Sequence, residues 1–298
     1  MENIVFSHRP SDLAKIPKRP ADSHKGSFGR VLVVGGSPCM SGAAYFAAKA
    51  AYRMGAGLVE ILTHEDNRII LQTQLPEAIM TTYGNAVVAD RLKIRAAVAK
   101  ADVIAIGMGI GQSENANELL KLVLSAADAP LIVDADALNL IAKDPTLFDL
   151  ISAPVIVTPH LLEMARLCRV DVKTVERDKM GIATDFAEKY ALTCVLKCHE
   201  TLVVSDGTED GGLSDKNRIY LNKSGNSGMA TGGSGDVLAG VIASLIAQGM
   251  RPFDAATLGV YIHGLAGDAA AEALGEYSLM ASDIIDHIPS IIKDCHDL

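Results

Sequence analysis

The 298-residue sequence contains no tryptophan, only 4% aromatic residues and no long apolar run. A membrane-spanning helix needs roughly 18 to 20 consecutive apolar residues, and no run in this chain is that long. Residues 1–9 also lack the apolar core of a signal peptide. We therefore predict a cytoplasmic protein that has no membrane partner.

Positive charge is in short supply as well. The chain has 27 Lys and Arg residues against 36 Asp and Glu residues, which gives a formal net charge of −9. Nucleic-acid-binding surfaces are basic, so this balance argues against nucleic acid as a partner. A phosphorylated small ligand would have to be held by backbone amides, a few cations and Mg²⁺.

The five cysteines are odd in number and show no metal-ligand spacing. Cys39, Cys168 and Cys295 are scattered, whereas Cys194 and Cys198 are four residues apart in a predicted strand. In a cytoplasmic protein such cysteines stay reduced. We interpret them as thiols of the core or of a site lining.

The most informative stretch is a glycine-rich loop that runs directly into an apolar segment. Residues 222–236, the glycine loop, contain five glycines and end in Gly232-Gly-Ser-Gly-Asp236, and a helix is predicted at residues 237–248. Glycine lets backbone amides turn toward one point, and the first amides of a helix have no intrahelical partner. The sequence therefore predicts an anion site suited to phosphate.

A carboxylate, Asp236, stands among these amides. It can be a helix cap, and a capped helix after a flexible turn is the simplest interpretation of a single glycine-rich loop. Beside a bound phosphate, however, a carboxylate would repel the ligand unless it takes a proton from the acceptor. We predict that Asp236 is a catalytic base and that Gly233, Ser234 and Gly235 form an anion hole.

The rest of the chain alternates short apolar runs with helical patterns. This alternation predicts right-handed βαβ crossovers and a three-layer α/β/α sandwich with a mostly parallel sheet. The predicted strands are residues 30–35, 58–62, 103–106, 131–133 and 155–157. The predicted helices are residues 43–54, 115–127, 161–168, 172–190, 237–248, 252–273 and 282–287.

The second half of the chain contains closely spaced runs. Residues 193–197 and 201–205 are separated by only three residues, and 218–221 form a third run. Such spacing favours hairpins, so we predict an antiparallel edge of the sheet. With no linker or repeat in the sequence, we predict a single domain over residues 1–298, in which residues 1–22 are an N-terminal extension interrupted by prolines.

Polar and glycine residues follow several predicted strands, where the ligands of a doubly wound sheet bind. They are Gly107-Met-Gly-Ile-Gly111, Asp134-Ala-Asp136, Thr158-Pro-His160 with Glu163, and residues 197–201. Each has a simple alternative: a tight turn, a pair of helix caps, a satisfied histidine or a solvated lysine. Together they predict one crevice at the edge of the sheet.

An anion hole beside a base indicates phosphoryl transfer to an alcohol. The sequence has no Walker-type phosphate loop, so the glycine loop would hold the transferred phosphate. Glu163 would hold Mg²⁺ through water, because Mg²⁺ takes few carboxylates and keeps several waters.

Several motifs together resemble one family. Gly232-Gly-Ser-Gly-Asp236 is similar to the anion hole and base of the ribokinase-like superfamily. More narrowly, nearly the whole chain from about residue 20 resembles the ADP-dependent NAD(P)H-hydrate dehydratases. The motifs are His24-Lys-Gly-x-x-Gly29, Val33-Val-Gly-Gly-Ser37, Ser41-Gly-Ala-Ala44, Met54-Gly-Ala-Gly-Leu58, Asp134-Ala-Asp-Ala-Leu138, Thr158-Pro-His160 with Glu163, and Asn222-x-x-Gly-Asn-x-x-Met-Ala-Thr-Gly-Gly-Ser-Gly-Asp-Val-Leu-Ala-Gly240.

The resemblance implies repair of hydrated NADH or NADPH with ADP as co-substrate. Water added across a ring double bond leaves a hydroxyl on C6, and phosphorylation makes that hydroxyl a good leaving group. Elimination of phosphate then restores NADH or NADPH, and ADP becomes AMP. By this resemblance Ala43, Gly109, His160 and Asp236 would contact the hydrate. The residues that contact the adenine nucleotide would be Lys197, Cys198, His199, Glu200, Thr201 and Gly235.

The chain departs from the family pattern at two places. Lys197-Cys-His-Glu-Thr201 stands where the family often has Lys-Gly-Ala-x-Thr, and His160-Leu-Leu-Glu163 stands where it has His-Pro-Gly-Glu. The added carboxylate of Glu200 near a phosphate would weaken nucleotide affinity or favour a metal. The two end positions, Lys197 and Thr201, are retained.

The resemblance also implies a homo-oligomer, a tetramer, and a separate NAD(P)H-hydrate epimerase as a partner. We expect no fused epimerase domain, because the chain starts close to the first strand of the dehydratase pattern. Two other functions stay open at this point. One is a ribokinase-like kinase of a small alcohol or vitamin precursor, and the other is a nucleotide-binding regulator without turnover.

Overall fold

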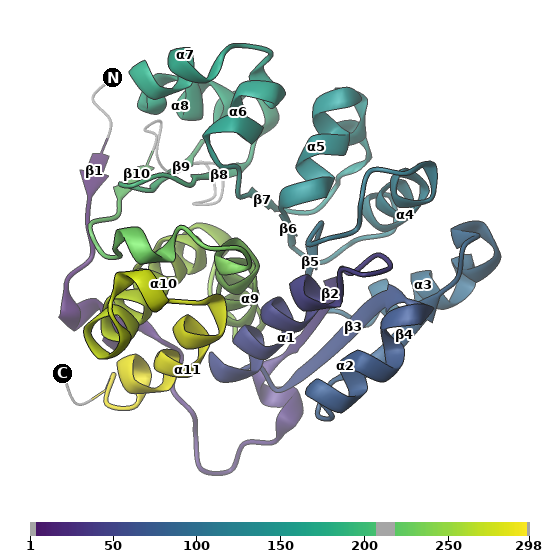
Figure 1. Ribbon diagram of the computed structural model, residues 1–298, viewed down its shortest axis with the longest axis horizontal. Helices are drawn as coiled ribbons and strands as arrows, with labels where there is room; N and C mark the ends of the chain where they lie inside the picture. The colour runs from purple at the N-terminus through teal and green to yellow at the C-terminus, as the bar shows by residue number, and fades with distance from the viewer. Residues whose placement is uncertain (1–3, 207–217, 297–298) are drawn as a thin grey trace.

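The computed structural model describes residues 4–206 and 218–296. A ten-stranded sheet lies at its centre and is covered by helices on both faces, which is the predicted three-layer sandwich (Figure 1). The strands lie in the order β1-β10-β9-β8-β7-β6-β5-β2-β3-β4. Their bounds are β1 (Ile4–Phe6), β2 (Arg30–Val34), β3 (Leu58–His64), β4 (Ile79–Tyr83), β5 (Val103–Ile106), β6 (Leu131–Val133), β7 (Val155–Val157), β8 (Thr193–Leu196), β9 (Leu202–Ser205) and β10 (Arg218–Leu221).

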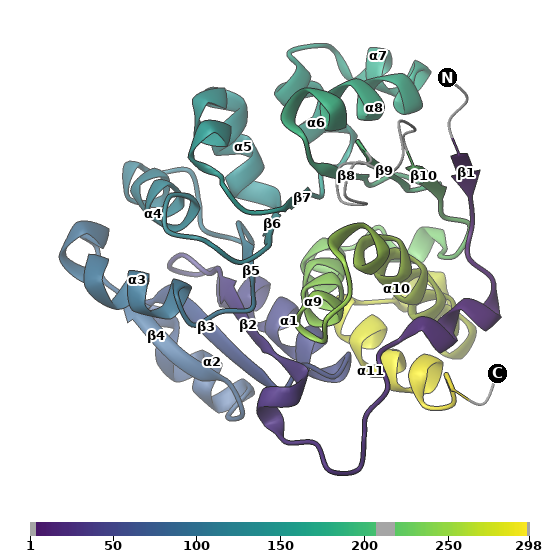
Figure 2. The ribbon, with the colours of Figure 1, turned by 180° about the vertical axis from the view of Figure 1, so that it is seen from behind.

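The helices form two layers that do not mix (Figures 1 and 2). One layer consists of α1 (Ser41–Arg53), α2 (Arg68–Gln74), α9 (Ser234–Ala247), α10 (Pro252–Leu274) and α11 (Ala281–Ile292). The other consists of α3 (Arg91–Val98), α4 (Glu114–Leu124), α5 (Ala135–Lys143), α6 (Leu161–Cys168), α7 (Val172–Arg177) and α8 (Lys179–Tyr190). No helix in the described ranges is long and apolar enough to cross a membrane.

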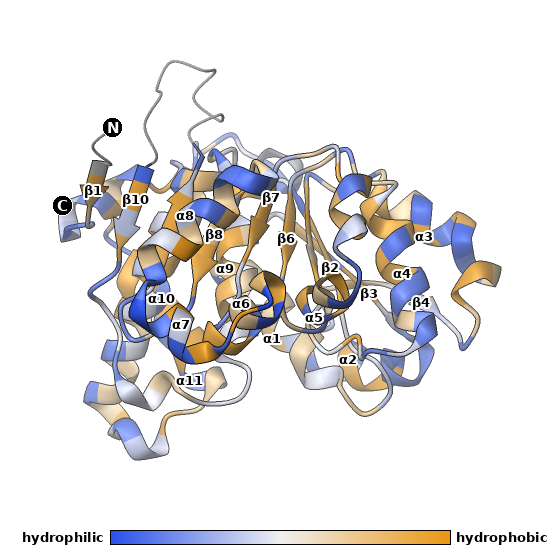
Figure 3. Ribbon diagram, turned by 90° about the horizontal axis from the view of Figure 1, so that it is seen from above, coloured by the Kyte–Doolittle hydropathy of each residue, from blue (hydrophilic) through white to orange (hydrophobic). Residues whose placement is uncertain are grey.

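Each face of the sheet packs its own apolar core. Along β2, Val31 and Val33 join the core under α1 and α9, and the alternate residues Leu32 and Val34 join the opposite core. This alternation follows from the two-residue repeat of a strand. In Figure 3 the central strands are accordingly apolar, and the polar residues lie on the outer faces of the helices.

The predicted antiparallel edge is confirmed. Strand β9 runs antiparallel to both of its neighbours, β8 and β10. At this edge the sheet extends one strand further than predicted, because β1 pairs in parallel with β10. Part of the expected N-terminal extension therefore belongs to the sheet, and residues 1–3 of that extension lie outside the described residues. A three-residue strand among prolines has too short a pattern to be found from periodicity.

The prediction of one continuous helix over residues 172–190 was wrong. Residues 172–190 form two helices, α7 and α8, because the backbone breaks at Asp178, which has φ −136° and ψ 60°. The Asp178 carboxylate accepts a hydrogen bond of 3.0 Å from the Gly181 amide and so caps α8. Val175 and Phe186 still enter the same core. No element was predicted between β3 and β5, where α2, β4 and α3 lie.

Helices α1 and α9 approach each other at backbone distance. A Cβ placed on Gly240 of α9 would lie 2.1 Å from the carbonyl oxygen of Ala47 in α1. Ala44, Ala48 and Ala51 of α1 are fully buried around this contact. Small residues therefore let α1 and α9 pack closely together. This packing helps to fix the position of the N-terminus of α9.

We expect Gly240→Ala to destabilise the protein by about 1–3 kcal/mol, the usual cost of overpacking a close contact. The two helices must separate to admit the methyl group, because neither the new Cβ nor the Ala47 carbonyl oxygen can rotate away from the clash. Gly42→Ala in α1 is the control, since its Cβ would meet only the Phe46 ring, at 3.9 Å. Denaturant midpoints measure the effect, and equal midpoints for the two variants would contradict it.

Candidate active site at the start of helix α9

A cavity of about 780 Å³ opens where β6, β7 and β8 end, beside the N-terminus of α9. It brings together most of the site residues that the sequence predicted. These are His160, Glu163, Lys197, Cys198, His199, Thr201, Gly233, Ser234, Gly235 and Asp236. Segments more than seventy residues apart in the chain thus line one cavity, as the positions after the strands predicted.

Three predicted residues do not line this cavity. Ala43 and Gly109 lie against each other instead, since a Cβ on Gly109 would be 3.1 Å from the Ala43 Cβ. Glu200 contributes its backbone oxygen to a local contact with Cys198 Sγ, at 3.0 Å. The structure therefore separates the predicted hydrate contacts into the Ala43–Gly109 pair and the cavity wall that contains His160 and Asp236.

A buried ion pair lies at the base of the cavity. Lys197 Nζ donates a 2.6 Å hydrogen bond to Asp134 Oδ1, and the same oxygen accepts the Ala135 amide at the start of α5. Burial alone would lower the pKa of Lys197, but the carboxylates of Asp134 and Glu163 outweigh it and the pKa is raised. A Cβ on Gly235 would be 3.3 Å from Lys197 Nζ, so a cation lies directly beside the first turn of α9.

Asp236 is not the cap of α9. The N-cap is Gly233, three residues earlier, with φ 94° in the left-handed region that glycine adopts without strain. Burial, and after it the nearby charge of Asp134, raise the pKa of Asp236 to about 7, and Lys197 opposes the rise. A carboxylate with this pKa is poised to accept a proton near neutral pH.

The amides of the glycine loop do not all face the cavity. The Gly225 amide donates to Asp268 Oδ2 at 2.9 Å, and the Gly228 amide donates to Asn226 Oδ1 at 3.0 Å. The idea that the whole loop turns its amides toward one ligand is therefore wrong. The place left for an anion is the start of α9, where helix amides lack intrahelical partners, although the Ser234 amide already donates to the Thr231 carbonyl at 3.3 Å.

His160 and Glu163 form a reciprocal cap at the start of α6. His160 Nδ1 accepts the Leu162 and Glu163 amides at 3.1 and 3.2 Å, and Glu163 Oε2 accepts the His160 amide at 2.8 Å. Burial, together with Lys197, lowers the pKa of His160, so its ring is neutral. Burial raises the pKa of Glu163 to about 7. The interpretation of His160 as a satisfied histidine is thus correct, although its half-exposed ring also lines the cavity.

Sequence reasoning missed part of the lining, including Asn222, Asn226 and His263. His263 Nε2 lies 3.4 Å from Ser234 Oγ, and burial lowers the pKa of this histidine to about 4. A signal was present in the sequence. His263 and Asp268 are polar residues in a helix, α10, whose other positions are mostly apolar and buried.

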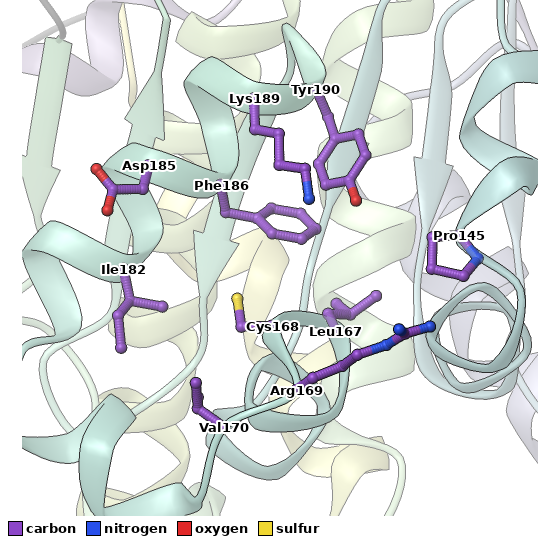
Figure 4. A pocket seen from close by; sticks show the side chains of 10 residues that line it. All are labelled: Pro145, Leu167, Cys168, Arg169, Val170, Ile182, Asp185, Phe186, Lys189 and Tyr190. Carbon is purple, nitrogen blue, oxygen red and sulfur yellow. The ribbon is translucent and has the colours of Figure 1, made fainter.

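A second cavity, of about 360 Å³, lies between α6 and α8 (Figure 4). Leu167 and Cys168 of α6 face Phe186 and Tyr190 of α8 across it. Burial raises the pKa of the Cys168 thiol, which disfavours the reactive thiolate. None of the predicted site residues lines this cavity. The prediction of core or site-lining thiols is confirmed for Cys194 and Cys295, which are buried, and for Cys198, which lines the larger cavity, but it is wrong for Cys39, which is exposed.

Comparison with known proteins identifies the family. The family described as NAD(P)H-hydrate dehydratase matches residues 31–290. The chain belongs to this family. An ADP-dependent (S)-NAD(P)H-hydrate dehydratase of Neisseria meningitidis is 39% identical over 271 residues, which cover 89% of this chain and 86% of that protein.

Relatives with two activities are longer than this chain. A bifunctional NAD(P)H-hydrate repair enzyme Nnr of Moorella thermoacetica is 39% identical over 290 residues, which cover 95% of this chain and 53% of that protein. The chain thus spans about half the length of such relatives. Among solved structures, the ADP/ATP-dependent NAD(P)H-hydrate dehydratase of Bacillus subtilis, co-crystallised with ATP and Mg²⁺, has 30% identity and a TM-score of 0.82, covering 99% of each chain.

In this NAD(P)H-hydrate dehydratase family member, the charge of Asp236 should cost stability. Its pKa is raised from 3.8 to about 7, so between these pH values the folded state binds more protons than the unfolded state, and stability falls as pH rises. Asp236→Asn should therefore be more stable than the wild type at pH 8, by about 1–2 kcal/mol after solvent screening.

The gain should be largely lost near pH 4, because the folded carboxyl is then protonated and the unfolded carboxyl, with a pKa of 3.8, is only about half ionised. Urea unfolding of the two proteins at pH 8 and pH 4 measures it. A variant less stable than the wild type at pH 8 would show that favourable contacts, and not burial, dominate at Asp236.

Proposed function

We propose that this protein dehydrates hydrated NADH or NADPH with ADP as co-substrate, which gives NADH or NADPH, AMP and phosphate. The observation that carries the proposal is the buried Asp236 carboxylate in the first turn of α9, beside helix amides suited to phosphate. A protein that only binds nucleotide gains nothing from a negative charge at this place. A site that phosphorylates a hydroxyl needs a base there.

In the proposed first step, Asp236 takes the proton from the C6 hydroxyl of the hydrate. The C6 oxygen then forms a bond to the β-phosphorus of ADP, the bond from that phosphorus to the bridging oxygen breaks, and AMP leaves. The anion hole of Gly233, Ser234 and Gly235 would stabilise the charge on the transferred group together with the adjacent ammonium of Lys197.

In the second step the C6–O bond breaks and phosphate departs with the oxygen. The C5 proton of the ring passes to water or to the departing phosphate, and the electron pair of that C–H bond forms the C5–C6 double bond. Phosphate is a far better leaving group than hydroxide, which is why the first step is needed. His160, with its neutral ring, would contact the hydrate from the cavity wall, and the Ala43–Gly109 pair would contact it as the family resemblance implies.

The adenine nucleotide would occupy the rest of the cavity. Lys197, Cys198, His199 and Thr201 line that part, as does Gly235. Glu200 lies outside the lining, so its carboxylate would not face the phosphates, and the departure from the family pattern leaves the two end positions of the segment in place.

The chain offers Mg²⁺ little by itself. In the described residues there is no group of three or more His, Cys, Asp or Glu side chains that could hold a metal. Glu163 Oε2 already accepts the His160 amide, which fits only a contact through water. We propose that Mg²⁺ arrives with the nucleotide phosphates, neutralises their charge and meets Glu163 through water.

We also propose that the chain acts as one domain and assembles as a homotetramer, with a separate NAD(P)H-hydrate epimerase supplying the reactive epimer. Exposed apolar side chains at the end of α10 and in the segment before α11 support association. They are Leu274, Tyr277 and Met280.

A paired assay tests function and donor together. Purified protein is given hydrated NADH or hydrated NADPH with either ADP or ATP, and reduced-nicotinamide absorbance is followed. We expect absorbance to return with ADP, and AMP and phosphate to form in equal amounts. No return of absorbance, together with ADP-dependent phosphorylation of a stable small alcohol such as a vitamin precursor, would replace the dehydratase by a kinase.

The base assignment predicts a pH profile. Asp236 must be ionised to take a proton, so turnover should fall about tenfold per pH unit below pH 7, and Asp236→Asn should lose turnover while it still binds ADP. Glu163 has a similar pKa, so Glu163→Gln separates the two carboxyls. The acidic limb should persist in Glu163→Gln, and its disappearance would assign the limb to Glu163 instead.

A further inference from the structure

One carboxylate of α10 holds two donors of the glycine loop. Asp268 Oδ2 accepts the Gly225 amide at 2.9 Å, and Asp268 Oδ1 accepts Asn226 Nδ2 at 3.0 Å. Gly225 and Asn226 both line the large cavity, whereas Asp268 does not. Asp268 thus acts on the cavity only through the loop.

The loop is also fixed on its other side. Asn226 Oδ1 accepts the Gly228 amide at 3.0 Å, which closes the turn into a short 3-10 helix at Ser227–Met229. The Ser227 hydroxyl donates to the Glu276 carboxylate, in the short helix Glu276–Ser278 that follows α10. Two carboxylates, Asp268 and Glu276, therefore hold one loop without any ligand.

The surface of α10 is shaped to receive this loop. A Cβ on Gly264 would lie 2.1 Å from Ser224 Oγ, and a Cβ on Gly267 would lie 2.2 Å from Met229 Sδ. Gly264, Gly267 and Asp268 are three and four residues apart, so they share one face of the helix. His263, one residue before Gly264, lies near the Ser234 hydroxyl. Helix α10 thus contacts the glycine loop near both ends of the loop, at Ser224 and at Ser234.

We propose that Asp268 is a positioning residue for nucleotide binding: it holds residues 225–229 in the shape that contacts ADP. A carboxylate suits this position, because it offers two acceptor oxygens and no donor to two separate N–H groups. The proposal takes the ligand, ADP, from the proposed function. It concerns binding and not the proton transfer at Asp236.

The test measures ADP binding by calorimetry, which needs no turnover. Asp268→Asn keeps one acceptor oxygen, so Kd for ADP should rise about tenfold, and Asp268→Ala loses both, so Kd should rise about thirtyfold or more. At saturating ADP the kcat should stay within about threefold of the wild type, and the pH at the midpoint of the acidic limb should not move, since Asp236 is untouched.

Asp171→Ala is the matched control. Asp171 also accepts one backbone and one side-chain hydrogen bond, from Thr174 N at 2.8 Å and Thr174 Oγ1 at 3.0 Å, but it caps α7 away from the cavity. Its loss should lower stability and leave Kd for ADP unchanged. A purely structural role for Asp268 would give the same pattern in Asp268→Ala, and that result would overturn the proposal.

Amide hydrogen exchange of the ADP-free protein separates this proposal from the proposed function. Residues 225–229 should exchange faster in both Asp268 variants and at the wild-type rate in Asp171→Ala. Unchanged exchange in Asp268→Ala would also overturn the positioning role. A wild type that binds no ADP would refute the nucleotide part of the proposed function, while the exchange data would still decide whether Asp268 shapes the loop.

Discussion

The site depends on the ion pair between Lys197 and Asp134. The chain carries a net charge of −9, and the proposed function requires this crevice to accept a phosphate beside three carboxylates, those of Asp134, Glu163 and Asp236. Lys197 is the cation that lies among them, and its short bond to Asp134 ties the end of β8 to the end of β6. A buried pair of this kind contributes little net stability, because desolvation offsets the attraction. Its value here is placement, since it fixes an ammonium beside the first turn of α9.

The architecture of the fold explains why α9 begins at that point. Close contact with α1 at Gly240 sets the spacing between the two helices, and the left-handed Gly233 is the N-cap of α9. Asp236, the proposed base, then lies in the first turn of the helix, where burial raises its pKa. Backbone geometry, helix packing and proton affinity are therefore consequences of the same few small residues.

Much of this could be predicted from the sequence. The alternation of apolar runs gave the three layers, and the residues after each strand gave the crevice, because parallel strands end at one edge. Apolar periodicity predicted one helix where the backbone breaks at Asp178. The three-residue strand β1 was too short to show a sequence pattern. The glycine loop shows a different limit. Glycines predicted amides free to turn, but only the structure shows that the Gly225 amide is already taken by Asp268.

The reciprocal cap at His160 and Glu163 has one more consequence. The same Nδ1 that lines up the first amides of α6 must stay unprotonated to do so, and the ring it belongs to faces the cavity. The cap of α6 and the proposed contact with a ligand thus both need the tautomer of His160 that carries its proton on Nε2. Acid that protonates this ring would loosen the start of α6 and alter the cavity wall in one event, so the two responses to acid are thermodynamically linked and should be seen at the same pH.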